Sequence, residues 1–504
     1  MTTIYQNLQS RVLGQREFHF NPTLWFQENV TRSWWLMLWL VVLTYISVQV
    51  VLAQLAEAAV TTTVILLLWV VSIAFTALGE ITRQHTAVSQ WLKQNLYSSI
   101  TNAQLTLVLT LLLLAGLRGF TEYALLDASF STNPEVAAAE TADGGARWGA
   151  VIANLPNLMI FRFPRAETWR IWAAIGLIVA LTIPSTVVYR GTRFKRSPIR
   201  TALTFLWLLS PLVIFFLIRG VSGSGFLPQV NPDIAWGGLL LTLIISVFAI
   251  VASFPLGLLL ALGRRSQIRG IPAWLTWALA AAISVWGLIT STPENLAAAR
   301  TTSERVLAYW PLAIPIIAFL FQRYFRGNVV ALFSTLYIEV VRGVPLITVL
   351  FMSLIMFPIF LPPNVNVLNT WRVLVAVALF AAAYLAENVR GGLQAIPKGQ
   401  YEAADALGLS TYKKYRLIIL PQALRVVIPA IVGQFIGLFK DTTLVAIVGL
   451  VDLLGTANLI SAQPNWLGVR REPYIFIALI YFIGSAVMAG YSRRLEARLG
   501  VGER

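Results

Sequence analysis

Cysteine is absent from the 504-residue sequence, and histidine occurs only twice. Without cysteine the chain forms no disulfide, carries no thiol nucleophile and offers no thiolate to a metal ion. The two histidines, His19 and His85, are too far apart in the sequence to indicate a metal site. No Asp-x-Asp pair or histidine–carboxylate cluster is present. We therefore expect neither a metal site nor catalytic residues in this chain.

Charged residues are scarce as well. They make up 12% of the sequence, against 57% hydrophobic residues and a mean hydropathy of +0.73. Soluble globular proteins carry about a quarter charged residues, so this composition indicates an integral membrane protein whose solvent is the lipid bilayer. The net charge of +16 comes from short basic clusters between apolar runs. Such clusters are typical of cytoplasmic loops and not of a nucleic-acid-binding stripe, so we expect no nucleic-acid partner.

Apolar runs of about 17 to 25 residues are long enough to cross a bilayer as helices, and the sequence holds about twelve of them. The polar N-terminus, Met1 to Ser33, shows no cleavable signal pattern, so we expect the first span to be retained. The predicted spans centre on Trp34–Leu55, Val60–Leu78, Ile100–Leu117, Ile171–Tyr189, Ala202–Ile218, Gly238–Leu262, Pro272–Ile289, Val306–Phe321, Val344–Leu361, Val373–Ala386, Leu424–Leu438 and Tyr474–Gly490. They predict an all-α, polytopic membrane protein.

The basic clusters fall in alternate loops, which places both termini in the cytoplasm by the positive-inside rule. The long connection from Gly119 to Arg170 is rich in acids and is expected outside. The clusters comprise Arg190, Arg193, Lys195, Arg196 and Arg200; Arg264, Arg265 and Arg269; Arg323, Arg326 and Arg342; Lys398, Lys413, Lys414, Arg416 and Arg425; and Arg493, Arg494 and Arg498.

A short basic loop between two apolar segments carries a specific motif. It reads Glu402-Ala403-Ala404-Asp405-Ala406-Leu407-Gly408, then nine further residues, then Ile418-Ile419-Leu420-Pro421. The spacing resembles the E-A-A-x3-G-x9-I-x-L-P signature of the membrane subunits of bacterial ATP-binding-cassette (ABC) importers. Residues 394–401 immediately before it look like the same family. The resemblance implies that Glu402, Ala403, Ala404, Gly408, Leu420 and Pro421 belong to the loop gripped by the ATPase partner.

Local chemistry predicts the shape of this loop. We expect a short helix from Gln400 to Leu407 with Ala403 and Ala404 on its surface, where small residues let another protein approach the backbone. Gly408 should end it in a left-handed conformation. Ser410 can cap a second short helix, and Pro421 should stop the loop before the next span. The alternative is an ordinary connection on a membrane surface.

Two pentads place an acid three residues before an arginine, a helical spacing that brings the two side chains together. They are Glu339 with Arg342, and Glu387 with Arg390. Such pairs either hold and switch helices that line the pathway or are ion pairs at helix ends near the cytoplasmic interface.

Residues 435–445 resemble the Lys-Asp-Thr-Ser-Leu-Val block of the same permeases, with a threonine in place of the serine. Lys440, Asp441, Thr442 and Thr443 are therefore candidates for a gate or substrate contact, or else form a charged helix end. Tyr384 and Gln434 are candidate wall residues of the pathway, because polar groups in apolar spans meet a partner or water. Helix–helix hydrogen bonding is the alternative for them.

The resemblance extends over 236–269 and from 332 to the C-terminus, which look like the five-helix core of polar amino-acid permeases of the histidine and glutamine branch. It implies a type I ABC importer permease core at 236–504 with an inserted helical hairpin at about 270–327. Residues 1–235 then form an N-terminal extension of about five transmembrane helices. The longer general L-amino-acid permeases, which this chain resembles most, have such extensions. We expect the extension to serve as scaffold against lipid or the partner subunit, because it shows no carboxylates of the kind an ion pathway needs.

The sequence contains no Gly-x4-Gly-Lys-Ser/Thr phosphate loop, so ATP hydrolysis must come from a separate subunit. The resemblance implies a dimer of ABC ATPases that binds ATP and Mg, a second and different permease chain, and a periplasmic amino-acid-binding protein. This chain itself needs no cofactor. The expected function is translocation of L-amino acids across the bacterial cytoplasmic (inner) membrane by alternating access. The alternative is an ion-coupled secondary transporter, which would need midplane acids or broken helices.

Overall fold

The computed structural model describes residues 34–84, 86–142, 144–190, 197–266, 270–363 and 365–499. Within these ranges the chain folds into helices and connecting loops, with no named strand, which confirms the predicted all-α class. Several sequence predictions lie outside the described residues: the N-terminal segment 1–33 with His19, as well as His85, Arg193, Lys195, Arg196 and Arg269.

The number of membrane-spanning helices agrees with the sequence prediction. Ten helices of the described residues are long and apolar enough to cross a membrane, and two bent helix pairs raise the number to as many as twelve. The ten are Met37–Glu57, Ala59–Thr82, Ile100–Leu126, Arg165–Tyr189, Pro198–Arg219, Gly238–Arg264, Ala273–Ala298, Asn369–Ala395, Thr411–Ala446 and Arg471–Ala497.

The two bent pairs differ from the straight spans predicted there. The first joins Thr302–Ala308 to Trp310–Phe325 at 50°, and the second joins Val329–Gly343 to Leu346–Phe360 at 107°. In the second pair the sharp turn precedes Pro345, which disfavours helical backbone in the residue before it. The predicted span from Val344 therefore misses a separate helix that comes before it.

The first of two compact units consists of Met1–Ser129 and Val136–Ala146. Its long helices pack on one another, and a hydrogen bond from the Trp69 indole to the Ala103 carbonyl (2.9 Å) joins two of them. The helices are α3 (Trp34–Glu57), α4 (Ala59–Thr82), α5 (Ala87–Asn95), α6 (Ile100–Thr121), η1 (Glu122–Leu126) and α7 (Pro134–Glu140), of which α7 begins in the second unit.

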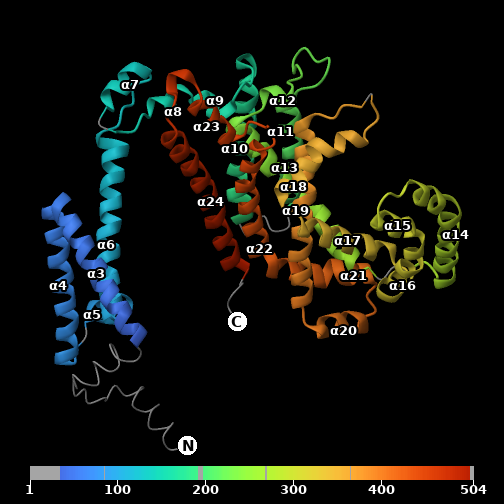
Figure 1. Ribbon diagram of the computed structural model, residues 1–504, viewed down its shortest axis with the longest axis horizontal. Coiled ribbons are helices and arrows are strands. Elements are labelled where there is room, and N and C mark those ends of the chain that lie inside the picture. Colours follow the sequence, from blue (N-terminus) through green and yellow to red (C-terminus); the bar gives the residue numbers. More distant parts are fainter. Residues whose placement is uncertain are drawn as a thin grey trace, which may run out of the picture. The chain divides into compact units, whose positions relative to one another are not determined.

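The second unit, Phe130–Glu135 with Arg147–Arg504, contains the signature loop. Figure 1 shows its long helices and the short helices at their ends. They are α8 (Gly149–Ala153), α9 (Leu155–Ile160), η2 (Arg165–Glu167), α10 (Trp169–Arg190), α11 (Pro198–Arg219), α12 (Pro232–Ala235), α13 (Gly238–Arg264), α14 (Ala273–Ala298), α15 (Thr302–Ala308), η4 (Trp310–Leu312), α16 (Ala313–Phe325), α17 (Val329–Gly343), α18 (Leu346–Phe351), η5 (Met352–Met356), η6 (Phe357–Phe360), α19 (Asn369–Ala395), α20 (Lys398–Ala406), α21 (Thr411–Lys414), η7 (Tyr415–Ile419), α22 (Leu420–Asp441), η8 (Thr442–Ala446), α23 (Leu453–Ser461), η9 (Pro464–Trp466) and α24 (Arg471–Leu499).

Helix α19 is the centre of this unit, because α13 and α22 both pack against it. Small residues permit the close approach. A Cβ atom on Gly257 of α13 would lie 2.8 Å from the Ala382 carbonyl oxygen, and one on Gly392 of α19 would lie 2.6 Å from that of Ala423. Helices in lipid associate through such small-residue contacts, since burial of apolar surface gives them little driving force there.

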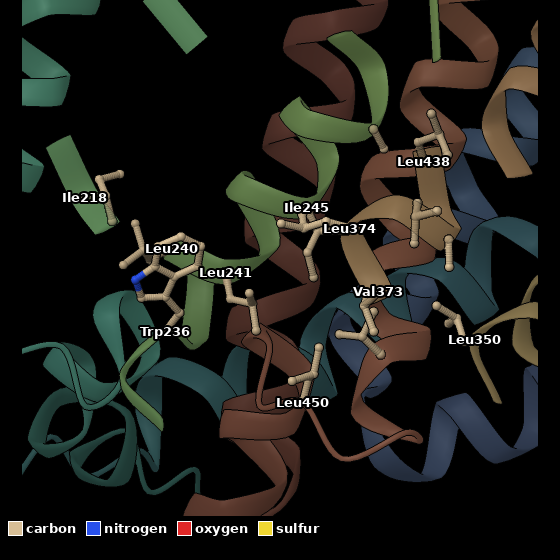
Figure 2. Packing of buried hydrophobic residues seen from close by; sticks show 14 of the residues in the cluster. Ile218, Trp236, Leu240, Leu241, Ile245, Leu350, Val373, Leu374, Leu438 and Leu450 are labelled. Carbon is tan, nitrogen blue, oxygen red and sulfur yellow. The ribbon is translucent and has the colours of Figure 1, made fainter. Parts of the chain in front are cut away.

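A cluster of buried apolar side chains fills the space between α11, α13, α18 and α19 (Figure 2). Leu241, Ile245, Val373 and Leu374 are fully buried in it. Because these side chains interdigitate from separate helices, they hold the first halves of α13 and α19 together. A second cluster, which includes Leu385, Val389, Ile419 and Ala423, lies closer to the signature loop.

Hydrogen bonds at both ends show that α13 and α19 run in the same direction. Asp233, just before α13, accepts hydrogen bonds from the backbone amides of Asn369 and Thr370 at the start of α19 (both 2.8 Å). Arg265, just after α13, donates to the carbonyl oxygen of Leu393 near the end of α19 (3.4 Å). We call the end where both helices begin the far end and the end where both finish the coupling end, which leads into α20.

The two ends of the segment between α13 and α17 lie next to each other and are joined by hydrogen bonds. The Ile271 amide donates to the Gly327 carbonyl (2.9 Å), and the Asn328 side chain donates to the Ser266 carbonyl (2.9 Å). Between them, α14 packs against α16. The division of the chain into an extension (1–235), a core (236–504) and an inserted hairpin (270–327) does not coincide with the two compact units and stays a prediction.

Candidate coupling segment and pathway residues

The signature motif forms the short helix α20 at the coupling end, at the lower edge of the second unit in Figure 1. The Gly408 amide donates to the Asp405 carbonyl (2.9 Å), and the Leu409 amide donates to that of Ala404 (3.2 Å). This is a Schellman C-cap, which requires a left-handed residue after the helix. Gly408 has φ +68°, as its predicted role demands, and a Cβ there would meet nothing within 4 Å. Only backbone conformation therefore disfavours a side chain at this position.

The two alanines of the motif differ in exposure. Glu402 and Ala403 face solvent, whereas Ala404 is fully buried. The prediction that both alanines lie on the surface is therefore wrong for Ala404. Neighbouring helix positions point about 100° apart, and Ala404 is the position of α20 that is turned into the protein, where α20 packs against η7. The exposed face of α20 includes Glu402, Ala403, Ala406 and the adjoining Leu407.

Two further expectations for the loop are corrected. Ser410 occupies the position before α21, but its side chain forms no capping hydrogen bond. Pro421 does not end the loop before the span: α21, η7 and α22 form one helical stretch, Thr411–Ala446. Pro421 follows directly on the π-helical turn η7, where the regular ladder of backbone hydrogen bonds is interrupted, so the helical stretch accommodates its missing amide.

Glu387 of α19 is the centre of the predicted ion pairs. Its carboxylate pairs with Arg390 (Nε to Oε2, 2.8 Å) and also lies 3.6 Å from Arg342 and 3.7 Å from Arg264. Glu339, however, pairs with Arg264 at 2.8 Å. The predicted pairing of Glu339 with Arg342 within one helix is therefore wrong. The reason is tertiary: the last turn of α13 brings Arg264 to Glu339, so the charges connect α13, α17 and α19.

Tyr384 and Gln434 both make contacts between helices. The Gln434 side chain accepts from the Asn388 amide and donates to the Ala381 carbonyl, both at 2.8 Å, which links α22 to α19. The ring of Tyr384 lies 5.6 Å from the Arg342 guanidinium and 4.9 Å from the Phe380 ring. Helix–helix hydrogen bonding thus describes Gln434, and also Tyr384, whose hydroxyl donates to the Arg342 carbonyl at 3.4 Å.

The Lys-Asp-Thr-Thr segment lies at the far end, where α22 passes into η8. Lys440 is exposed and Asp441 is half-buried. Thr442 is buried and donates to the Phe439 carbonyl (2.8 Å), and Thr443 donates to the Lys440 carbonyl (2.9 Å). The two hydroxyls therefore satisfy carbonyls at the end of α22.

Sequence reasoning missed a buried acid beside this segment. Asp452 is fully buried and caps α23 by accepting from the Gly455 amide (2.8 Å), and the Tyr481 hydroxyl lies 3.5 Å away. Burial raises the pKa of the Asp452 carboxyl from 3.8 to about 7. An acid directly before an apolar helix is a capping signal in the sequence. Its burial depends on the contact of this loop with the start of α13, where the Gly238 amide donates to the Val451 carbonyl (2.9 Å).

Comparison with known proteins identifies the family. A family model described as a binding-protein-dependent transport system inner membrane component matches residues 313–501. The chain is 35% identical over 413 residues to the inner membrane amino-acid ABC transporter permease protein YhdY of Escherichia coli (strain K12), covering 82% of this chain and 93% of that protein. The chain belongs to the amino-acid ABC transporter permeases.

Other relatives match part of this permease. The glutamate/glutamine/aspartate/asparagine transport system permease protein BztC of Rhodobacter capsulatus is 44% identical over 54% of this chain, which spans 49% of that relative. A crystal structure of an amino acid ABC transporter with histidines covers 52% of this chain and 92% of its own, at 26% identity and a TM-score of 0.36.

Membership of this family decides several of the predictions. The protein is a multi-pass inner-membrane permease subunit of an ATP-driven amino-acid importer, and its partners include an ATPase and a binding protein. It is a translocation component and not an enzyme. The alternative of an ion-coupled secondary transporter is not supported.

Proposed function

We propose that this permease translocates L-amino acids by alternating access, and that the exposed face of α20 is the surface on which its ATPase acts. The observation that carries the proposal is the geometry of α20: a capped helix presents Glu402 and Ala403 outward directly below the ends of α13 and α19. A small residue beside an acid lets a partner reach the helix backbone, and the rigid cap fixes the angle at which it is met.

The proposed assembly has two ATPase subunits, which bind ATP and Mg, and a second permease chain that differs from this one. ATP-driven closure of the ATPases moves the α20 helices, and the permease pair rocks between inward- and outward-facing states. A periplasmic binding protein delivers the amino acid at the far end. In this scheme Tyr384 and Gln434 line the pathway, and Lys440, Asp441, Thr442 and Thr443 form its outer gate.

The charged cluster of Glu339, Arg342, Glu387 and Arg390 is proposed to hold α17 and α19 in register as the transporter changes state. Its support is the number of cations around one acid, since Glu387 lies within 4 Å of three arginines. A carboxylate shared in this way can exchange partners when the helices move, without an unpaired charge at membrane depth.

The orientation follows from the basic loops: the coupling end and both termini are cytoplasmic. The charge asymmetry supports it, since Lys413, Lys414 and Arg416 lie at the coupling end. In sealed right-side-out vesicles, a tag inserted between Glu122 and Glu140 should be labelled from outside, and tags at Lys195 and Lys413 should be protected. Labelling at Lys413 from outside would reverse this orientation.

Reconstitution in proteoliposomes tests the function. With the ATPase and the loaded binding protein present, uptake should require ATP and should persist when proton and sodium gradients are collapsed at constant ATP. The purified chain alone should neither hydrolyse ATP nor transport, because it has no phosphate loop. Uptake by this chain alone, driven by an imposed ion gradient, would contradict the proposal. Comparing ATPase stimulation by each amino acid in turn would identify the substrate.

A further inference from the structure

We propose that the Tyr401 hydroxyl is the positioning contact that ties α20 to the ends of α13 and α19. The inference rests on the coupling role proposed for α20. The Tyr401 hydroxyl donates to the carbonyl oxygen of Leu393 at 3.0 Å. The Arg265 guanidinium donates to the hydroxyl oxygen at 3.3 Å and to the same carbonyl at 3.4 Å. Three elements therefore meet at one phenol oxygen: the end of α13, the end of α19, and α20.

The contact satisfies a group that the helix itself leaves without a partner. Leu393 belongs to the last turn of α19, where backbone carbonyls have no intrahelical donor. A guanidinium at the negative end of the helix dipole is electrostatically favourable there. The Tyr401 hydroxyl thus accepts a hydrogen bond from Arg265 and donates one to the Leu393 carbonyl, and both partners belong to the core. These two bonds fix the start of α20 relative to the core.

The ring of Tyr401 is held on its other side. It packs edge-on against Tyr415 of η7, with centroids 6.3 Å apart and an interplanar angle of 72°. The remaining polar ties of α20 lead forward along the chain: Asp405 pairs with Lys414 (2.6 Å), and Gln400 accepts from Gln422 (3.3 Å). These join α20 to α21 and α22. Tyr401 adds the link to α13 and a side-chain contact to the end of α19, which the chain already joins to α20.

This difference gives the hydroxyl a mechanical role. A force applied to α20 reaches α19 and α22 through the chain, because α20 lies between them in the sequence, but α13 must also follow for the core to move as one body. Helices α13 and α19 run parallel and pack against each other. A contact that joins the last turn of one to the last turn of the other lets the two helices move together. The Arg265–Tyr401–Leu393 contact is placed to do so.

The test compares Tyr401→Phe with Tyr415→Phe. Both variants keep the aromatic pair, but only the first removes the hydroxyl held by Arg265. In proteoliposomes with the ATPase and loaded binding protein, the quantity measured is amino acid transported per ATP hydrolysed. For Tyr401→Phe we expect this ratio to fall about fivefold, the factor given by loss of one ordinary hydrogen bond, with unchanged co-purification of the ATPase. Tyr415→Phe should keep the parent ratio.

A double-mutant cycle with Arg265→Gln sharpens the test. If both side chains act through one contact, the double variant should be no worse than either single variant, whereas independent roles would add. An unchanged ratio in Tyr401→Phe, additive losses, or loss of ATPase co-purification would each overturn the proposal. If Gly408→Val uncouples transport while Tyr401→Phe does not, the positioning contact is refuted and the coupling role of α20 stands.

Discussion

The two ends of the permease core are built with different chemistry. At the far end, acids contact backbone groups: the partly exposed Asp233 caps the start of α19, and the buried Asp452 is enclosed beside the start of α13. At the coupling end, the contacts of α20 come from the side chains of Tyr401, Asp405 and Gln400. The far end is fixed by acids on backbone amides, whereas the coupling end is proposed to transmit motion through a few replaceable side-chain contacts.

Close helix packing is a third kind of contact in the core. Gly257 of α13 and, nearer the coupling end, Gly392 of α19 let α13, α19 and α22 approach so closely that a Cβ atom at either position would clash with a neighbouring helix. A change here should therefore affect folding, a change at the coupling end should affect transport, and a change at the far end should alter stability with pH.

The largest effect is expected from Gly392→Val. Its Cβ would lie 2.6 Å from the Ala423 carbonyl oxygen and 2.7 Å from the Val427 side chain, so α19 and α22 must separate. Overpacking of this kind costs about 1–3 kcal/mol. We expect much less folded protein and a lower melting temperature in detergent. The neighbouring Gly391→Val is the matched control, since its Cβ would meet nothing within 4 Å. Equal amounts of both folded variants would show that the helices are not closely packed there.

An intermediate effect is expected from Gly408→Val, with protein amount preserved and coupling lost. The left-handed backbone at φ +68° costs a β-branched residue about 1 kcal/mol or more, and the cap that orients α20 is broken. Uptake should be lost, and the loaded binding protein should no longer stimulate the ATPase. Gly408→Asn is the control, because asparagine tolerates this conformation and should retain most of the uptake. Normal uptake by Gly408→Val at equal expression would make α20 a passive connection.

The smallest effect on uptake and on the amount of folded protein is expected from Asp452→Asn, which changes how stability depends on pH. Because folding raises the pKa of this acid from 3.8 to about 7, the parent protein is most stable below pH 4 with respect to this group and loses that stability as the pH rises to about 7. Asparagine keeps the cap of α23 and carries no charge. Between pH 5 and pH 8 the melting temperature of the variant should therefore fall less than that of the parent. Identical pH profiles would show that Asp452 is not buried as a titrating acid.

Local chemistry was enough to predict part of this structure from the sequence. The apolar runs predicted the spans, and Gly408 predicted the end of α20, because both depend on residues close together in the chain. Ala404, Glu339 and Asp452 could not be placed in that way. The surroundings of Glu339 and Asp452 come from residues far away in the sequence, Arg264 and Gly238, and the burial of Ala404 depends on the packing of α20 against its neighbours.

The helix α17 shows a second limit of sequence reasoning. Its polar and charged residues interrupt the apolar run, so a search for long apolar stretches began only at Val344. The bend of 107° that follows it arises where Gly343 and Pro345 end one helix and allow the next to start.

The central claim is that the exposed face of α20 meets the ATPase, and the absence of cysteine from the chain permits a direct test. Single cysteines are introduced as Ala403→Cys on the exposed face, Ala404→Cys on the buried face, and Leu467→Cys at the exposed far end. Each is cross-linked in the assembled transporter with a short thiol-reactive reagent. We predict an ATPase adduct for Ala403→Cys alone. An ATPase adduct from Leu467→Cys, with none from Ala403→Cys, would contradict the account.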